Sequence, residues 1–289
     1  QFTVALPISG YTATVSGCSP FEITTLVTDV EDYQNDFHQK WSLVHKKLVS
    51  TSIGDMTFAE CAQKTSYLEL DTLLYGILCA TFPSNDKIAL SCGNPDCVDS
   101  EGNRTAYDHK YDNRTLLMME RLSDKGFKSL DRLLTETGTI EGAKKVADES
   151  MINTVVQVEL PVSGYVVTMA NRSVTEFIDE VAPIAQAAEG PRSQAAIISV
   201  FINSIDIPSD VYDEDAEYLT FTDYEAIVDI VYGLPKEDII EVGEIVEESF
   251  NGNPFEFGVR EVKCPVCGHS DDHVQVPIDT LLFYHNQIE

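Results

Sequence analysis

Apolar side chains recur at every second position near the start of the chain, and this alternation predicts a β-hairpin over residues 2–15. The residues that a tight turn needs lie in its middle, from Pro7 to Gly10. A near-identical segment follows 154 residues later, with its turn from Pro161 to Gly164. The matching segments are Leu6-Pro7-Ile8-Ser9-Gly10-Tyr11-Thr12-Ala13-Thr14 and Leu160-Pro161-Val162-Ser163-Gly164-Tyr165-Val166-Val167-Thr168. We therefore predict two hairpins of one kind and an internal repeat.

Apolar residues at helical spacing follow both hairpins. After the first hairpin, Ser19 and Glu22 form a capping pair at a helix start. The helical pattern continues over residues 36–49, 55–61 and 65–82 and, after the second hairpin, over residues 173–184, 194–205, 222–232 and 238–250. Helical patterns also fill residues 115–151, and those beyond about residue 120 have no counterpart in the second half, so we interpret them as a connector.

Each half also contains a short predicted strand that runs into a pair of cysteines. In the first half, residues 87–91 lead into Cys92 and Cys97, and a polar loop is predicted from there to about residue 112. In the second half, residues 255–262 lead into Cys264 and Cys267, and a last strand is predicted over residues 274–276.

The elements come in the same order in both halves, which predicts a tandem duplication. Two shorter matches favour it, Tyr75-Gly76 with Tyr232-Gly233 and Thr115-Leu116-Leu117 with Thr280-Leu281-Leu282. We predict an α+β fold of two similar units, each with a β-hairpin, helices and a small antiparallel sheet with a Cys-bearing turn. The first unit is predicted over residues 1–120, the helical connector over 121–153 and the second unit over 154–289.

The charge of the chain limits the partners that it can bind. The 289 residues include 48 acidic and 19 basic side chains, which gives a net charge of −29. Nucleic-acid-binding proteins need a basic surface, and an anionic membrane repels an acidic one, so we predict neither partner. No apolar run is long enough to predict a transmembrane helix. The simplest interpretation of the charge is a well-solvated surface, and a sharper one is an acidic face that binds basic proteins in an assembly.

The most specific motif is Cys264-Pro265-Val266-Cys267-Gly268, which is typical of a zinc knuckle. Its two thiolates lie on one tight turn, and the glycine lets backbone N–H groups point at sulfur. A structural zinc site needs four ligands, and Cys92 and Cys97 are the natural second pair if the two units pack about a pseudo-twofold axis, so that both turns face one metal. We therefore predict a structural Zn²⁺ held by Cys92, Cys97, Cys264 and Cys267.

Two alternatives to this shared zinc site stay open. One is a local site in which His269 and His273 join the second cysteine pair. The other is a set of free or disulfide-bonded thiols without a metal. The total of seven cysteines is odd, and three of them stand singly, so the chain does not have the pattern of a secreted disulfide framework.

Common catalytic and nucleotide-binding motifs are absent from the sequence. It contains no Gly-x-Ser-x-Gly, no His-Glu-x-x-His, no phosphate-binding loop and no dinucleotide fingerprint. A zinc ion with four thiolate ligands has no open position, so it stabilises a fold rather than catalysing a reaction. We predict a protein that is not an enzyme and has no catalytic residues.

The Leu-Pro-x-Ser-Gly start, the apolar helical middle and the strand that enters a Cys turn resemble the T4-type phage baseplate protein family. This family comprises hub subunits and hub-assembly proteins of contractile tails, and each half of the chain is similar to one such unit. The resemblance implies a structural or assembly role in the baseplate, other tail and baseplate proteins as partners, and assembly in the cytoplasm of a host bacterium. The alternative function is that of a cellular zinc-ribbon adaptor that binds a basic protein.

Overall fold

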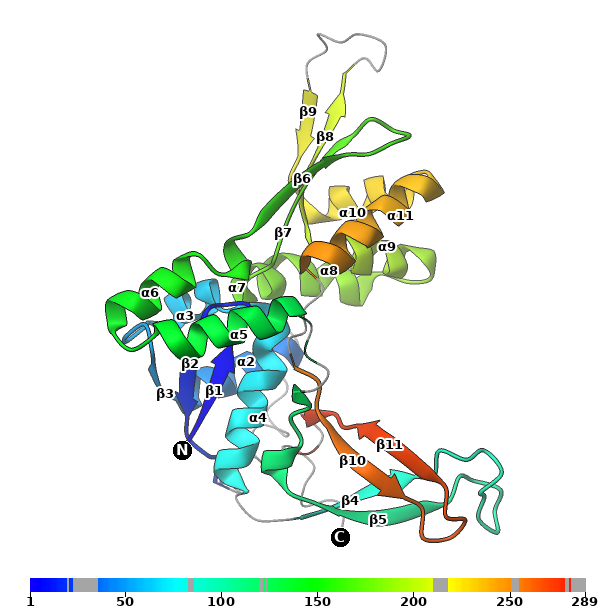
Figure 1. The fold of residues 1–289 in the computed structure, drawn as a ribbon. Helices are drawn as coiled ribbons and strands as arrows, with labels where there is room; N and C mark the ends of the chain where they lie inside the picture. Colours follow the sequence, from blue (N-terminus) through cyan, green and yellow to red (C-terminus); the bar gives the residue numbers. More distant parts are fainter. Residues whose placement is uncertain are drawn as a thin grey trace.

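The protein has an α+β fold, as predicted. The computed structural model describes residues 1–19, 21–22, 36–82, 86–119, 122, 124–209, 218–250, 255–278 and 281. In these residues the strands form four separate antiparallel sheets, and helices pack beside them (Figure 1).

The elements follow one another in the order of the chain. The strands are β1 (Phe2–Leu6), β2 (Tyr11–Val15), β3 (Leu48–Thr51), β4 (Asp86–Ser91), β5 (Ala106–Tyr111), β6 (Val155–Glu159), β7 (Val166–Ala170), β8 (Ile202–Pro208), β9 (Tyr218–Phe221), β10 (Gly258–Lys263) and β11 (Ser270–Gln275). The α-helices are α2 (Asp36–Lys47), α3 (Phe58–Lys64), α4 (Leu70–Thr81), α5 (Asp124–Glu136), α6 (Ile140–Asp148), α7 (Val174–Glu176), α8 (Ala182–Ala187), α9 (Pro191–Ser199), α10 (Tyr224–Tyr232) and α11 (Lys236–Ile245). Five-residue π-helical turns follow α7 and α11, over Phe177–Val181 and Val246–Phe250.

The two predicted hairpins are present and have the same backbone pairing. β1 pairs with β2, and β6 pairs with β7, in antiparallel register. A β-bulge directly follows Thr14 in β2 and Thr168 in β7. Beyond the hairpin, β2 and β7 each pair with a third strand, where Thr14 is opposite Ser50 and Thr168 is opposite Ser204. Thr14 and Thr168 are 154 residues apart, and so are Ser50 and Ser204. The match in sequence therefore coincides with a match in strand register.

The turn of each hairpin is held by one buried carboxylate. The Ile8 and Ser9 N–H groups donate to Oε1 and Oε2 of Glu69, at 2.7 and 3.0 Å. The Val162 and Ser163 N–H groups donate to Oδ1 and Oδ2 of Asp238, at 2.8 and 2.9 Å. Both acidic side chains are fully buried. The Ser9 hydroxyl adds a third hydrogen bond to Glu69. The Pro-x-Ser-Gly segments are therefore turns built around an internal carboxylate.

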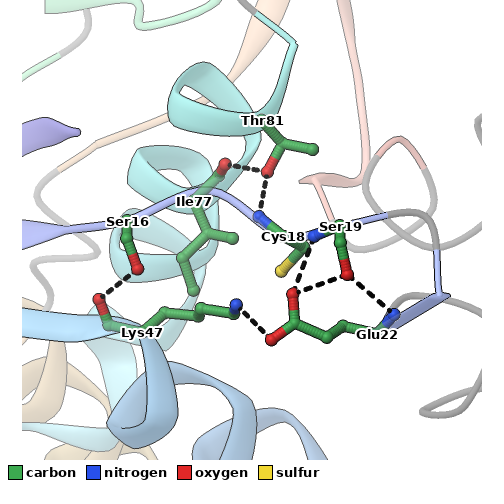
Figure 2. Close-up of polar contacts among 7 residues, drawn as sticks. All are labelled: Ser16, Cys18, Ser19, Glu22, Lys47, Ile77 and Thr81. Carbon is green, nitrogen blue, oxygen red and sulfur yellow. Dashed lines mark hydrogen bonds and ion pairs between the residues drawn. The ribbon is translucent and has the colours of Figure 1, made fainter.

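A capping pair follows each hairpin at the same distance. The Ser19 N–H and hydroxyl donate to Glu22, and the Ser173 N–H and hydroxyl donate to Glu176. In the first pair, Lys47 at the end of α2 also binds Glu22 at 2.5 Å, and this contact lowers the pKa of Glu22 to about 2 (Figure 2). The capping signature predicted at Ser19 is thus confirmed.

Three strands occur where the sequence indicated other structure. The helical pattern over residues 36–49 ends at Lys47, because β3 begins there and pairs with β2. The pattern over residues 194–205 ends at Ser199, because β8 begins at Ile202 and pairs with β7. The segment after Cys97, expected to be a polar loop, contains β5, which pairs with β4 along its whole length. In each case a neighbouring strand supplies hydrogen bonds that local sequence does not reveal.

One of the predicted repeat matches is wrong. Tyr75 and Gly76 are buried in the middle of α4, whereas Tyr232 ends α10 with 59% of its surface exposed. α10 begins 154 residues after α4 and packs on α9 as α4 packs on α2, whereas Asp238, which corresponds in role to Glu69, lies in the first turn of α11. Of the second short match, Thr280 and Leu282 lie outside the described residues.

The buried apolar residues of the described chain form two clusters. The first includes residues between positions 4 and 116, Leu130 and Ala143 of the predicted connector, Val174 and Ile178 of the predicted second unit, and the C-terminal residues from 255 to 281. The second lies between residues 160 and 250. The C-terminal hairpin β10–β11 therefore packs with the first cluster, although it is far from it in sequence. The unit boundaries near residues 120 and 153 stay a prediction.

The predicted connector is helical and packs on the first hairpin. Its helices α5 and α6 contact each other, and they lie beside β1 and β2 (Figure 1). The Ile152 N–H donates to the Ile8 carbonyl at 2.9 Å. Gly10 has a φ of +75°, and a Cβ atom on it would lie 2.5 Å from the Cβ atom of Ser150. A glycine is therefore required in this turn both for its conformation and for the close approach of the connector.

Candidate metal centre

The first cysteine pair lies on the hairpin β4–β5. Cys92 directly follows β4, and its N–H donates to the Thr105 carbonyl at 2.9 Å. The Thr105 N–H in turn donates to the Cys97 carbonyl at 3.0 Å, and the Cys97 N–H donates to the Asn94 carbonyl at 3.1 Å. These bonds fix both cysteines in the loop that connects β4 to β5, a strand that was not predicted. The alternation of Tyr107, His109 and Tyr111 with the charged Asp108 and Lys110 is the sequence signal that would have revealed this strand.

The second cysteine pair lies on the turn of the hairpin β10–β11. The Cys264 N–H donates to the His269 carbonyl at 2.9 Å, and the Gly268 N–H donates to the Cys264 carbonyl at 3.0 Å. Gly268 has a φ of +76°, which explains the glycine of the knuckle motif. Hydrogen bonds from the backbone N–H groups of Cys267 and Val266 lower the pKa of the Cys264 thiol to about 7. The turn thus presents its N–H groups to sulfur, as the sequence predicted.

The two cysteine-bearing hairpins have the same construction. In each, the first cysteine follows a strand and donates its N–H to the residue that precedes the returning strand, Thr105 in one case and His269 in the other. Cys92 and Cys264 are 172 residues apart. The second cysteine differs, because Cys97 is five positions after Cys92 and Cys267 is three positions after Cys264.

Backbone contacts hold the second hairpin against the segment that follows the first one. The Gly258 N–H donates to the Leu116 carbonyl at 2.8 Å, and the Met118 N–H donates to the Glu256 carbonyl at 2.9 Å. The Arg260 guanidinium adds bonds to the Thr115 and Leu117 carbonyls. Figure 1 shows the result, with β4, β5, β10 and β11 gathered at one end of the molecule, away from the sheet of β6 to β9.

This packing brings the four predicted sulfur atoms together. The Sγ atoms of Cys92, Cys97, Cys264 and Cys267 all lie within 4.8 Å of one another. The Cys92–Cys267 distance is 3.6 Å, and the Cys97–Cys264 distance is 4.0 Å. A tetrahedral zinc ion with Zn–S bonds of about 2.3 Å places its sulfur ligands about 3.8 Å apart. The cluster can therefore hold a metal ion such as zinc.

The surroundings of the sulfur atoms differ from one cysteine to the next. Cys92, Cys97 and Cys264 are buried, whereas Cys267 is exposed. Burial raises the pKa of the Cys92 thiol to about 12. Because a thiol must lose its proton to bind zinc, the metal charge has to offset the burial of this sulfur atom, and binding releases protons.

The predicted alternatives have less support from the geometry. Among the residues that the structure describes, the four cysteines are the group of potential ligands that meets around one point, and neither His269 nor His273 belongs to it. His269 instead contacts the Asp271 carboxylate at 3.2 Å, and His273 lies opposite Arg260 in the β10–β11 ladder. All described cysteines are free thiols, and the distances between the clustered Sγ atoms are longer than a disulfide bond of about 2.05 Å.

No protein-family model matches the chain, and no curated protein or solved structure matches it either. In the described part of the chain, no helix has the length and apolar character needed to cross a membrane.

Proposed function

We propose that the protein is a structural component of a larger assembly, in which one Zn²⁺ fixes the C-terminal hairpin to the first half of the chain. The observation that carries this proposal is the meeting of four sulfur atoms within 4.8 Å from hairpins about 170 residues apart. Four protein ligands leave a zinc ion no position for water or substrate, so the site has the chemistry of a structural metal rather than of an enzyme. The matching bulges, turns and caps support two similar units derived from a tandem duplication.

The assembly that we propose is the baseplate of a contractile phage tail. Its support is the resemblance of each half to the T4-type baseplate family, which implies hub or wedge proteins as partners. The net charge of −29 favours basic faces on those partners and disfavours DNA and anionic membranes. On this proposal, the protein acts within tail particles that assemble in the cytoplasm of the host bacterium.

A second candidate is a cellular adaptor that binds a basic protein through a zinc ribbon. The observation that favours it is the arrangement of the site, since two β-hairpins that each give two cysteines to one metal are typical of zinc ribbons. Fractionation of infected cells separates the two candidates. We expect the protein to sediment with tail or baseplate particles, and a free monomer without such association would favour the adaptor.

Metal analysis of the purified protein tests the site itself. We expect one zinc ion per chain, and we expect Cys97→Ser and Cys264→Ser, which change one ligand from each hairpin, both to lose it. The control is Cys61→Ser, because Cys61 is also buried but lies in α3 beside Tyr11 and Thr65, outside the cluster. Zinc that stays bound in Cys97→Ser would show that the two hairpins do not share a metal.

A further inference from the structure

The turns of the two equivalent hairpins differ in how much of their outer side is covered. In the first hairpin, Ile8 at the tip of the turn is 1% exposed, whereas Val162 at the equivalent position of the second hairpin is 57% exposed. The leucine directly before each turn, Leu6 or Leu160, is fully buried in both cases. The inner sides of the two turns are therefore packed alike, and the difference lies on the side that faces away from the core.

The helical connector covers the first turn. A Cβ atom on Gly10 would lie 2.5 Å from the Cβ atom of Ser150 and 2.9 Å from the Cα atom of Ala147, at the end of α6. The Ile152 N–H donates to the Ile8 carbonyl at 2.9 Å. Helix α6 and the short turn that follows it thus lie directly on the tip of the first hairpin.

The second turn has no such cover in the described part of the chain. A Cβ atom on Gly164, the equivalent of Gly10, would meet no described atom within 4 Å beyond its chain neighbours. No described backbone N–H donates to the Val162 carbonyl. Figure 1 shows the turn between β6 and β7 projecting from the molecule, whereas α5 and α6 lie beside β1 and β2. The second turn therefore presents the surface that α6 occupies on the first.

The covering helix shows which kind of segment fits this surface. The residues of the connector that are buried or lie against Gly10 are spaced i, i+3, i+4 and i+7, which is one face of a helix. They are Ala143, Val146, Ala147 and Ser150. Three of the four have very small side chains, which let the helix backbone approach the turn closely. A helix with small side chains at this spacing can lie across the second turn in the same way.

The surroundings of the second turn are acidic. Glu159 precedes the turn on β6 and is exposed, whereas the first hairpin has the neutral Ala5 at this position. Helix α11, which holds the turn through Asp238, has the sequence KEDIIEVGEI, with four acidic residues and one lysine. Charge complementarity therefore favours a helix with basic side chains beside its small apolar face.

We infer that the turn of the second hairpin is a docking site for an amphipathic helix of a partner protein. The small face of this helix lies on Val162 and Gly164, and its basic side chains lie towards Glu159 and α11. Docking removes the apolar surface of Val162 from water, and an N–H at the end of the helix can donate to the Val162 carbonyl, as Ile152 donates to Ile8. The docking site contains none of the cysteines, so it does not depend on the proposed zinc ion or on the identity of the assembly.

Fluorescence anisotropy of a labelled peptide, titrated with the full chain, tests the inference. The probe is the segment of residues 138–154 with Glu141→Lys and Glu149→Lys, held helical by a hydrocarbon staple between the exposed positions 144 and 148. We expect saturable binding, and we expect the same stapled peptide without the two lysine substitutions to bind about threefold more weakly or less. A third peptide, which adds Ser150→Leu to the basic probe, should not bind, because the larger side chain keeps the helix away from Gly164. No saturable binding of the basic peptide, or equal affinities of the three peptides, would overturn the inference.

Variants of the hairpin link the binding to its turn. Val162→Ser removes the exposed apolar side chain and should weaken the binding of the basic peptide about fivefold. Gly164→Ala adds a Cβ atom that only a docked helix would meet, and it should abolish binding. Val155→Ser is the matched control, because Val155 is similarly exposed but lies at the other end of the same hairpin, opposite Ala170.

Two results with these variants would contradict a partner helix at this turn. One is an equal affinity of Val162→Ser and Val155→Ser for the basic peptide. The other is a dimer of the wild-type chain in sedimentation equilibrium that Val162→Ser dissociates, because a second copy of the chain would then occupy the turn.

Discussion

Replacing Glu69 tests whether the repeated turns are held by their internal carboxylates. In the wild-type protein, Glu69 accepts the N–H groups of Ile8 and Ser9 on separate oxygens. Glu69→Gln keeps the shape of the side chain but turns one of these oxygens into an NH₂ group, which cannot accept a hydrogen bond. One buried N–H of the turn is then left without an acceptor, because the side chain and the turn are both enclosed.

The expected size of this effect follows from the contacts. A buried donor that loses its acceptor costs about 1–3 kcal/mol, so Glu69→Gln should lower the free energy of unfolding by that amount. Glu69→Ala removes the acceptors of both N–H groups and should cost roughly twice as much. Urea denaturation measures these differences, and hydrogen exchange of individual amides locates them.

The second unit supplies a matched control for this prediction. Asp238→Asn makes the same change at the turn of Val162 and Ser163. We expect Glu69→Gln to speed the exchange of the Ile8 and Ser9 amides, and Asp238→Asn to speed only that of Val162 and Ser163. If the Ile8 and Ser9 amides stay fully protected in Glu69→Gln, and its urea midpoint equals that of the wild type, Glu69 does not hold the turn.

Three further predictions concern charge and glycine. Burial raises the pKa of Glu69 from 4.5 to about 7. The stability that the protonated Glu69 side chain contributes is therefore complete below pH 4.5 and is lost as the pH rises through 7. In Glu69→Gln, the free energy of unfolding should depend less on pH over this range. Hydrogen bonds from Lys47, and next from Ser19, lower the pKa of Glu22 from 4.5 to about 2, so the stability that the charged Glu22 contributes is present above pH 4.5 and is lost as the pH falls towards 2. Lys47→Met should reduce this acid-side decline in an acid titration followed by circular dichroism. Gly10→Ala and Gly164→Ala both meet strain of about 1–2 kcal/mol from a positive φ. Only Gly10→Ala also collides with the connector, so equal urea midpoints for the two glycine variants would contradict the packing described above.

The sequence revealed the parts of the fold that depend on local pattern. The hairpin turns, the capping pairs and the knuckle motif each use residue types that determine their own backbone geometry, and all of them are present. The strands β3, β8 and β5 were missed because their pairing partners are distant in sequence or because their exposed faces are polar. The cluster of four cysteines was predicted because cysteine pairs are rare and specific, even though β5, whose hairpin carries two of them, was not.

The two residues that hold the turns could not be predicted from the sequence, for a different reason. Glu69 and Asp238 have the same role, but they differ in residue type and are 169 residues apart rather than 154. A comparison at a fixed separation therefore cannot pair them. In the second half, more residues separate the third strand from the carboxylate that holds the turn.

The position of the cysteine cluster determines what a metal contributes to this fold. A zinc ion bound to Cys97 and Cys264 joins residues 167 positions apart, and closing a loop of that length by a covalent link removes about 5 kcal/mol of chain entropy from the unfolded state. The cluster of buried residues between 160 and 250 contains none of the four cysteines, whereas three of them belong to the first cluster. Metal binding at this cluster would therefore be coupled to the docking of β10–β11 on the first half, whereas the second cluster is a separate group of buried apolar residues. It follows that a chelator should first expose the amides of the C-terminal hairpin to exchange, while those of β7 and β8 stay protected.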